Sequence, residues 1–394
     1  MRRVPPWLLL VAMLPAIAIL LGACSALPSP ATPPAPSATP QARGPAIMRS
    51  PDYSVQVFLW GSPHVERDLR LAKEAGFTWI KQMFQWNYIE GRGKGKFEWN
   101  EPDRLVKAAR QEGLKILARV DIAPEWARDK STDLKVSGPP KNNEDFGEFI
   151  HALVERYKPG SPFGEISAFQ IWNEPNLAFE WGGQQPDPVA YTRLLKVAYE
   201  AAKRANPDAL IISAGLSPTT ARGRIALPDS EFLKAMYDAG AKSYFDILGA
   251  HGAGYKAPPE LSPDEIGRDP RYNHNEPGAG RIYGFRHVED VRKIMVDNGD
   301  GAKRVSVLEF GWTSDPRPDS PYKWHSVSED EKASYIVRAF RYAKENWAPW
   351  IGVMSLIYIA DSQWTDKNEQ YHWAITRPDG GLRPAYIAFQ QMPK

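Results

Sequence analysis

The chain has 394 residues, 43% of them hydrophobic and 24% charged, as in an ordinary globular protein of one large domain or two modest ones. The formal net charge is +2, and it falls to zero without residues 1–23, which carry Arg2 and Arg3 and no acidic residue. A balanced chain lacks the basic character that nucleic-acid binding requires, so we expect no nucleic-acid partner. Cys24 is the only cysteine, which excludes an internal disulfide and a cysteine nucleophile or metal ligand in the rest of the chain.

The N-terminus has the pattern of a targeting segment. Arg2 and Arg3 form a positive region, and an apolar run from Trp7 to Leu21 has the length that a signal peptide uses. The run ends in Leu21-Gly22-Ala23-Cys24, which resembles a bacterial lipoprotein signal. That resemblance implies that Cys24 is lipidated and becomes the new N-terminus. A plain signal peptide or a membrane anchor is the alternative.

A stretch rich in Pro, Ala, Ser and Thr follows Cys24 and runs to Pro51. It holds too little apolar surface to fold, and its prolines favour an extended tether. We therefore predict a signal segment at 1–23, a tether at 24–51 and a folded domain at 52–394. The expected location is outside the cytoplasm, with a lipid anchor holding the domain at the cell surface, or else secretion.

From residue 52 onward, strand-like and helix-like segments alternate eight times. Most of the strand candidates are continuous apolar runs, as parallel strands covered on both faces require. They are Val55–Trp60, Thr78–Phe84, Lys115–Val120, Ile166–Trp172, Ala209–Ala214, Phe245–Ala250, Arg304–Phe310 and Gly352–Ile359. Amphipathic helices are expected to begin near Val65, Glu101, Glu144, Asp187, Asp229, Phe285, Ser328 and Arg383.

Eight strand–helix units indicate an α/β fold, a single (β/α)₈ TIM barrel. An open doubly wound sheet is the alternative, but it needs a glycine-rich phosphate-binding turn after its first strand, and Gly61-Ser62-Pro63-His64 is not one. The helix-to-strand connections are short, whereas residues 121–143, 251–284 and 313–327 form long strand-to-helix loops. In a barrel these long loops share the C-terminal face, where such enzymes keep their active sites.

Two of the predicted strands end in a glutamate. Ile171-Trp172-Asn173-Glu174-Pro175 closes the fourth strand, and Leu308-Glu309-Phe310 lies at the end of the seventh. Strands four and seven lie roughly opposite each other in an eight-stranded barrel, so Glu174 and Glu309 are expected to face each other across its mouth. Cleavage of a glycosidic bond uses such a pair, one acid to protonate the leaving oxygen and one to attack the anomeric carbon.

The Asn-Glu-Pro segment and the second glutamate resemble the retaining (β/α)₈ glycoside hydrolases of clan A, most closely the cellulase-like family 5 and the β-xylosidase-like family 39. The resemblance covers residues 52–394. It implies that Glu174 is the general acid/base, that Glu309 is the nucleophile and that Asn173 binds the hydroxyl next to the reacting carbon.

Further segments resemble clan motifs and supply candidate substrate-binding residues. Ala123-Pro124-Glu125-Trp126 resembles a Thr-Pro-Glu-Trp segment, and His251 resembles the histidine of a His-x-Tyr motif in which Tyr255 replaces the usual tyrosine. The clan often pairs its nucleophile with an arginine of the second strand, where this chain has Lys81 and, one strand later, Arg119. The expected substrate-binding set is Asn173, Trp86, Arg119, Trp126, His251, Tyr255, Trp312 and Trp364.

The sequence therefore predicts an enzyme that hydrolyses a β-linked oligo- or polysaccharide. A glycan-binding barrel that has lost turnover and a transglycosylase that uses the same carboxylates are the alternatives. No cofactor is expected. The seven histidines show no close ligand spacing such as His-Glu-x-x-His, so no metal site is predicted, and no Gly-x-Ser-x-Gly elbow points to a serine nucleophile.

Overall fold

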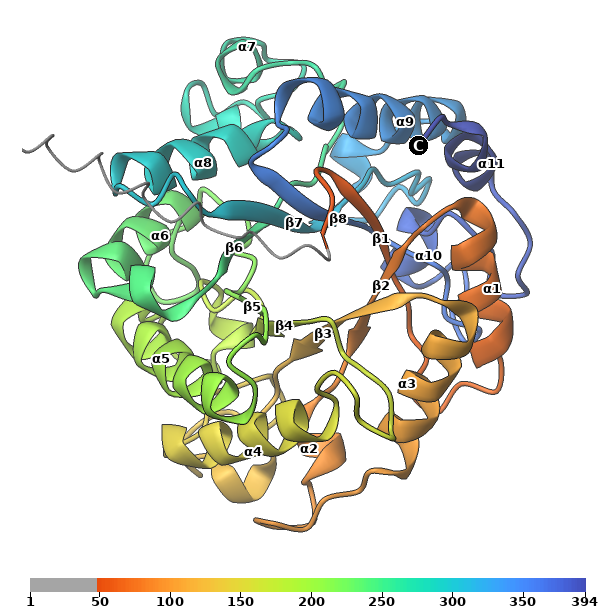
Figure 1. Cartoon of the computed structure of the whole chain (residues 1–394). Coiled ribbons are helices and arrows are strands. Elements are labelled where there is room, and N and C mark those ends of the chain that lie inside the picture. Colours follow the sequence, from red (N-terminus) through yellow and green to blue (C-terminus); the bar gives the residue numbers. More distant parts are fainter. Residues whose placement is uncertain (1–47) are drawn as a thin grey trace, which may run out of the picture. The chain divides into compact units, whose positions relative to one another are not determined.

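The computed structural model describes residues 48–394, which form a closed barrel of eight parallel strands. Figure 1 shows the strands at the centre and the helices in a ring around them. Each strand pairs with its neighbours in the chain, and the first pairs with the last. The strands are β1 (Asp52–Gln56), β2 (Trp79–Met83), β3 (Lys115–Val120), β4 (Ala168–Ile171), β5 (Ile211–Ile212), β6 (Ile247–His251), β7 (Arg304–Phe310) and β8 (Ile351–Leu356).

Within residues 48–394, eight α-helices make up the ring, and three short α-helices lie in the loops. The ring consists of α1 (Val65–Ala75), α3 (Asn100–Glu112), α4 (Asn143–Arg156), α5 (Pro188–Ala205), α6 (Asp229–Asp238), α8 (His287–Asp297), α9 (Glu329–Asn346) and α11 (Pro384–Gln391). The short helices are α2 (Trp86–Ile89), α7 (Pro263–Arg268) and α10 (Glu369–Trp373). Local chemistry sets several starts: Ser328 and Glu331 form a capping box on α9, and the Asp187 side chain caps α5.

The apolar residues form two layers that the barrel wall separates. Inside the barrel lies a cluster of Met48, Trp79, Leu117, Ala168, Leu210, Ile212, Ile247, Leu308 and Val353. The larger cluster lies between the outer faces of the strands and the inner faces of the helices. The inner cluster closes one end of the barrel, so the space for polar side chains is left near the C-terminal ends of the strands.

An irregularity in β7 decides which way Glu309 points. Ala250 of β6 pairs with Val307, but the next residue, His251, pairs with Glu309, so β7 carries one extra residue. Leu308 belongs to the inner cluster and Phe310 to the outer one. A bulge of this kind re-aims the side chains that follow it, and here Leu308 and Glu309 both reach the inside.

The predicted barrel is confirmed, with adjustments at the strand ends. The first strand runs over 52–56 instead of 55–60, because Asp52 is a buried polar residue that accepts a hydrogen bond from the Trp79 indole (2.8 Å) and so begins the strand without an apolar signal. Val57 and Leu59 are fully buried but lie beyond the ladder. Barrel contacts begin at Met48, which is buried in the inner cluster although it lies within the predicted tether.

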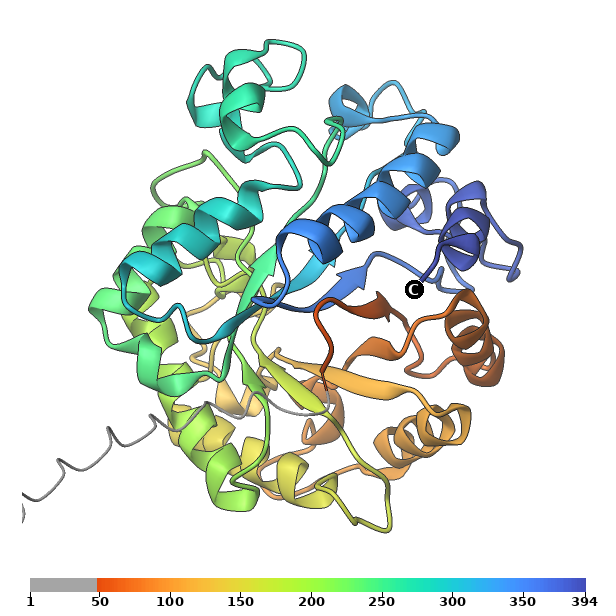
Figure 2. The same cartoon turned by 45° about the horizontal axis from the view of Figure 1, so that its top comes forward.

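The connection between β6 and α8 is the largest addition to the barrel. It carries α7 and stands clear of the ring of helices (Figure 2). A small core of Ala257, Ile266, Ile282 and Tyr283 holds it together. The signal segment, Cys24 and most of the tether lie outside the described residues. Between residues 48 and 394 no helix combines the length and the apolar character that a membrane span needs.

Candidate active site

Glu174 follows β4 in a backbone conformation that residues other than glycine rarely adopt. Trp172 and Glu174 have φ values of 71° and 40°, in the left-handed region, and Glu174 immediately precedes Pro175. Residues held in this region cost of order 1–3 kcal/mol each and gather at functional sites. The turn is fixed by hydrogen bonds from Glu174 N to Gly215 O (3.0 Å) and from Leu177 N to Glu174 O (2.9 Å). The strand end thus holds the carboxyl group in a set position.

His251, at the end of β6, reaches Glu174. Its Nδ1 lies 2.9 Å from Glu174 Oε1, and its Nε2 is buried without a hydrogen-bond partner among the residues that the structure describes. Gly215 makes this approach possible, because a Cβ there would lie 2.2 Å from the His251 ring atoms Cδ2 and Nε2. The structure thus brings His251 and Glu174 together at the ends of β6 and β4.

Glu309 is held by cations. Lys81 of β2 is fully buried and donates to Glu309 Oε1 (2.8 Å) and to Leu308 O (3.1 Å), and Arg119 Nη1 lies 3.7 Å from the same carboxylate oxygen. Burial by itself would raise the pKa of Glu309, but Lys81, His251 and Arg119 outweigh it and lower the pKa to about 2. Glu309 is therefore ionised across the neutral range, and both of the expected cations contact it.

Arg119 also joins two further carboxylates to the site. Its Nε donates to the buried Asp121 (2.5 Å), and its Nη2 lies 3.9 Å from Glu180 Oε1. Burial, opposed by Arg119 and reinforced by Asp121 and Glu174, raises the pKa of Glu180 to about 7. Glu180 was absent from the predicted set, since nothing in its local sequence, Phe179-Glu180-Trp181, distinguishes it from a loop acid.

Two of the predicted aromatic contacts are wrong. Trp86 and Trp312 are fully buried. Trp86 stacks on Phe149 (5.7 Å between ring centroids, 19° between planes), and the Trp312 indole donates to Ala257 O (3.0 Å). Each lies near a strand end, as expected, but its ring packs into the core and presents no face to a sugar.

Trp126 and Trp364 are half-buried. The Trp126 indole donates to Glu90 O (2.7 Å), and its ring meets Trp86 edge-on. The Trp364 ring makes edge-to-face contacts with the rings of Phe58 (4.7 Å between centroids) and Tyr358 (5.5 Å). Trp364 therefore belongs to an aromatic group at the ends of β1 and β8, and its role as a sugar platform stays a proposal.

Two predicted substrate contacts remain, Asn173 and Tyr255. Asn173 is buried and accepts a hydrogen bond from Gln170 Nε2 (3.3 Å). Tyr255 stacks on Trp324, and burial, with smaller contributions from nearby charges that include Glu174, raises its pKa.

Tyr358 was missed, although it lies in the apolar run that continues beyond β8. Burial, and then the negative charges of Glu309, Glu369 and Glu174, raise its pKa well above the usual range. Its position after a strand was the available signal. Over the described part of the chain, no three His, Cys, Asp or Glu residues are grouped so as to hold a metal ion.

Solved structures with the same barrel were found, whereas no protein-family model and no curated protein matches the chain. A family 39 glycoside hydrolase from Bacteroides cellulosilyticus WH2 is 21% identical with a TM-score of 0.62, covering 87% of this chain and 63% of the other. A GH39 β-xylosidase from Caulobacter crescentus is 19% identical with a TM-score of 0.60, covering 87% and 70%.

A third structure, GH5_18 from Streptomyces cattleya in complex with GlcNAc, is 14% identical with a TM-score of 0.58, covering 88% of this chain and 80% of the other. The chain thus spans between about two thirds and four fifths of the length of these proteins. At these identities the similarity establishes the fold: this chain has the barrel of family 39 and family 5 glycoside hydrolases.

Proposed function

We propose that the chain is a retaining β-glycosidase that hydrolyses O-glycosidic bonds of a β-linked glycan. The observation that carries the proposal is that the two carboxylates at the strand ends have different neighbours. Glu309 is held ionised by Lys81 and Arg119, whereas Glu174 contacts His251. Among residues 48–394, no Lys or Arg lies within ion-pair distance of Glu174. A carboxylate held ionised by cations, together with a second carboxyl group that has no such partner, is the pairing that glycosidic cleavage uses for its two roles.

The reaction has two steps. In the first, a Glu309 oxygen bonds to the anomeric carbon while the glycosidic C–O bond breaks, and Glu174 gives its proton to the departing oxygen. In the second, Glu174 takes a proton from a water molecule whose oxygen attacks the same carbon and releases Glu309. Glycan-active relatives of this fold support the proposal: the Caulobacter protein is described as a β-xylosidase, and another matching structure as an exo-β-1,4-mannosidase.

Glu309→Ala with sodium azide tests the nucleophile. We expect the variant to be inactive on aryl β-glycosides, and azide to restore turnover with an α-glycosyl azide as product, because the small anion attacks from the side that Glu309 vacates. Glu345→Ala, at an exposed position of α9, is the control and should behave as wild type. A β-glycosyl azide, or no rescue in a variant that remains folded, contradicts the assignment.

Glu174→Gln tests the acid/base. Substrates with good leaving groups, such as dinitrophenyl glycosides, should still form the glycosyl-enzyme, whereas alkyl glycosides should stall because their leaving oxygen needs a proton. Equal slowing of both classes contradicts the role of Glu174.

The same experiments separate the alternative functions. Wild-type protein that binds β-glycans but hydrolyses no aryl or natural β-glycoside is a binding barrel. Wild-type protein that converts donors to longer glycosides in the presence of acceptor sugars, with little free sugar, is a transglycosylase.

We further propose that Cys24 carries a lipid that anchors the protein outside the cytoplasm, with the Pro-rich tether as spacer. The supporting observation is the Leu-Gly-Ala-Cys ending of the apolar N-terminal run. Growth with radiolabelled palmitate should label the wild type and leave Cys24→Ala unlabelled. Equal labelling, or recovery of unlabelled wild type in the soluble fraction, overturns the proposal.

A further inference from the structure

We propose that Trp60 and Tyr88 bind a second sugar residue of the glycan, next to the one that reacts at Glu309, so that cleavage occurs at least two residues from the non-reducing end of a chain. The inference rests on the proposed glycosidase function and names its substrate class. It is carried by a strip of aromatic side chains that leads from the strand end of the nucleophile over the loops after β8, β1 and β2.

The chain that continues β1 turns its side chains alternately outward and inward. Val55, Val57 and Leu59 are fully buried in the cluster between the strands and the helices. Successive side chains of an extended chain point to opposite faces, so Phe58 points to the inside of the barrel. Phe58 is half-buried, as expected for a residue at the mouth.

The register of β1 and β2 gives the level of Phe58 relative to the nucleophile. Gln56 of β1 is the strand partner of Lys81 of β2. The Lys81 ammonium group donates to Glu309 Oε1 (2.8 Å). Phe58 lies two residues beyond Gln56 toward the C-terminal end of the strand, a rise of about 7 Å. Its ring is therefore on the mouth side of the Lys81–Glu309 ion pair.

Tyr358 and Trp364 join Phe58 at the inner end of the strip. Ile357 N donates to Phe310 O (3.1 Å), so the chain after β8 runs beside the strand end that carries the nucleophile. The ring centroids of Phe58 and Tyr358 lie 5.3 Å apart, and the Trp364 ring contacts both of them. The three half-buried rings form one continuous aromatic surface next to the catalytic residues.

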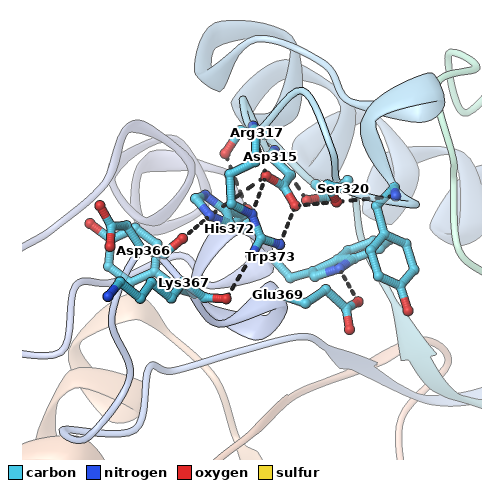
Figure 3. A network of polar contacts seen from close by, with 12 residues as sticks. Asp315, Arg317, Ser320, Asp366, Lys367, Glu369, His372 and Trp373 are labelled. Atoms are coloured by element: carbon cyan, nitrogen blue, oxygen red, sulfur yellow. Dashed lines mark hydrogen bonds and ion pairs between the residues drawn. The ribbon is translucent and has the colours of Figure 1, made fainter.

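The loop after β8 that carries Trp364 is fixed to the loop after β7. Asp315 accepts hydrogen bonds from Arg317 Nε (2.9 Å) and Nη2 (2.6 Å), and His372 Nε2 lies 3.7 Å from it (Figure 3). Arg317 Nη1 also donates to Lys367 O (2.5 Å), in the same loop as Trp364. A surface that is held in this way loses little conformational entropy when a ligand binds.

Trp60 and Tyr88 form the outer end of the strip. Their ring centroids lie 5.3 Å apart, with 36° between the ring planes. Trp60 follows Phe58 by two residues and rests partly on the outer cluster, whereas Tyr88, in α2, is 51% exposed. The pair thus continues the aromatic surface from Phe58 outward to the rim of the mouth.

The main chain on both sides of Trp60 is fixed as well. Leu59 N donates to Gln82 Oε1 (2.9 Å), and Gly61 N donates to Glu101 Oε1 (2.7 Å). Gln82 is the neighbour of Lys81 on β2, so the position of Trp60 is tied to the strand whose lysine holds the nucleophile. Single exposed aromatic rings are common on proteins, but a fixed series of them that leads out of a catalytic mouth indicates a binding surface.

A glycan chain has the chemistry that this strip requires. The C–H face of a pyranose is apolar and can be buried against an aromatic ring, while its hydroxyl groups stay in water at the ring edge. The reacting sugar has its anomeric carbon at Glu309 and its leaving group toward Glu174. Because β8 lies opposite β4 in the closed barrel, the strip extends away from the leaving group. The residue bound there is therefore linked to the reacting sugar on the side of the non-reducing end.

Kinetics on aryl glycosides of increasing length test the inference. The probes are 4-nitrophenyl β-glycosides of one, two and three residues of xylose, glucose or mannose, joined by β-1,3 or β-1,4 bonds. We expect wild type to release an intact disaccharide and nitrophenol from the best two-residue probe, with kcat/KM about tenfold above that of the one-residue probe. Tyr88→Ala and Trp60→Ala should each bring this ratio close to one, whereas Tyr88→Phe, which keeps the ring, should retain it.

Phe163→Ala is the matched control and should leave the ratio unchanged, because Phe163 is a 41% exposed aromatic residue on the loop between α4 and β4, at the other end of the barrel. Equal kcat/KM of wild type on the one- and two-residue probes overturns the inference while the proposed function stands. Removal of a single sugar from the two-residue probe before nitrophenol appears does the same, as does a ratio that survives both alanine substitutions. Wild-type protein that hydrolyses none of the probes overturns the proposed function, and the inference with it.

Discussion

His251 joins the two carboxylates of the site: its Nδ1 lies 2.9 Å from Glu174 Oε1, and its backbone is the β6 partner of Glu309 on β7. One residue therefore contacts Glu174 through its side chain and is aligned with Glu309 through the register of two strands. The arrangement depends on Gly215 of the β5–α6 loop, which leaves room for the imidazole.

Gly215→Ala should lower activity without unfolding the barrel. The new methyl would lie 2.2 Å from the His251 ring and force the imidazole away from Glu174. We expect kcat to fall about 100-fold, the usual cost of misplacing a catalytic group by an ångström. Gly301→Ala is the matched control, because its Cβ would make only ordinary contacts, at 3.5 Å or more. Equal activity of the two variants contradicts the positioning role of His251.

Lys81→Met should shift the pH dependence of catalysis. Lys81 is the strongest of the groups that lower the pKa of Glu309 to about 2, so its loss should raise that pKa. The acidic limb of kcat/KM should move up by about one unit or more. Lys203→Met removes a half-buried lysine that pairs with Asp246 (2.9 Å) on the outer surface and should leave the limb in place. If the acidic limb of kcat/KM does not move in Lys81→Met, Lys81 does not lower the pKa of Glu309.

Glu180→Gln should stabilise the fold above neutral pH. The pKa of Glu180 is raised from 4.5 to about 7, so its stability cost is absent below pH 4.5, grows as pH rises to about 7, and stays constant above. Removing the charge should increase the free energy of unfolding by about 2 kcal/mol at pH 8 and by little at pH 5. Urea unfolding at the two pH values checks this, with Glu345→Gln as control. If the gain in the free energy of unfolding is the same at pH 5 and pH 8, the charge of Glu180 is not its cause.

His287→Gln should destabilise the fold most at low pH. The buried imidazole contacts Asp229 (2.6 Å) and Asp290 (3.2 Å), and these carboxylates outweigh burial and raise its pKa from 6.5 to about 10. Its stabilisation is therefore complete below pH 6.5 and is lost as pH rises through 10. Urea unfolding should show a loss on the order of 3 kcal/mol at pH 6 that shrinks by pH 10. The exposed His64→Gln should show neither effect.

The sequence by itself determined the barrel and the acid pair. Eight apolar runs separated by amphipathic segments admit few folds, because strands buried on both faces must lie in a parallel sheet that helices cover. Glu174 and Glu309 were visible because each interrupts such a run at its C-terminal end. These signals are local in the chain, so a single sequence is enough to detect them.

The tertiary structure decided which neighbours those acids have. The bulge that turns Glu309 inward, the approach of His251 over Gly215, and the approach of His372 to Asp315 all depend on residues far apart in the chain. Trp86 and Trp312 were misassigned for the same reason: a tryptophan at a strand end has one sequence signature, whether its ring faces a ligand or the helix layer. Only packing against particular partners, such as Phe149 behind Trp86, settles the direction of a side chain.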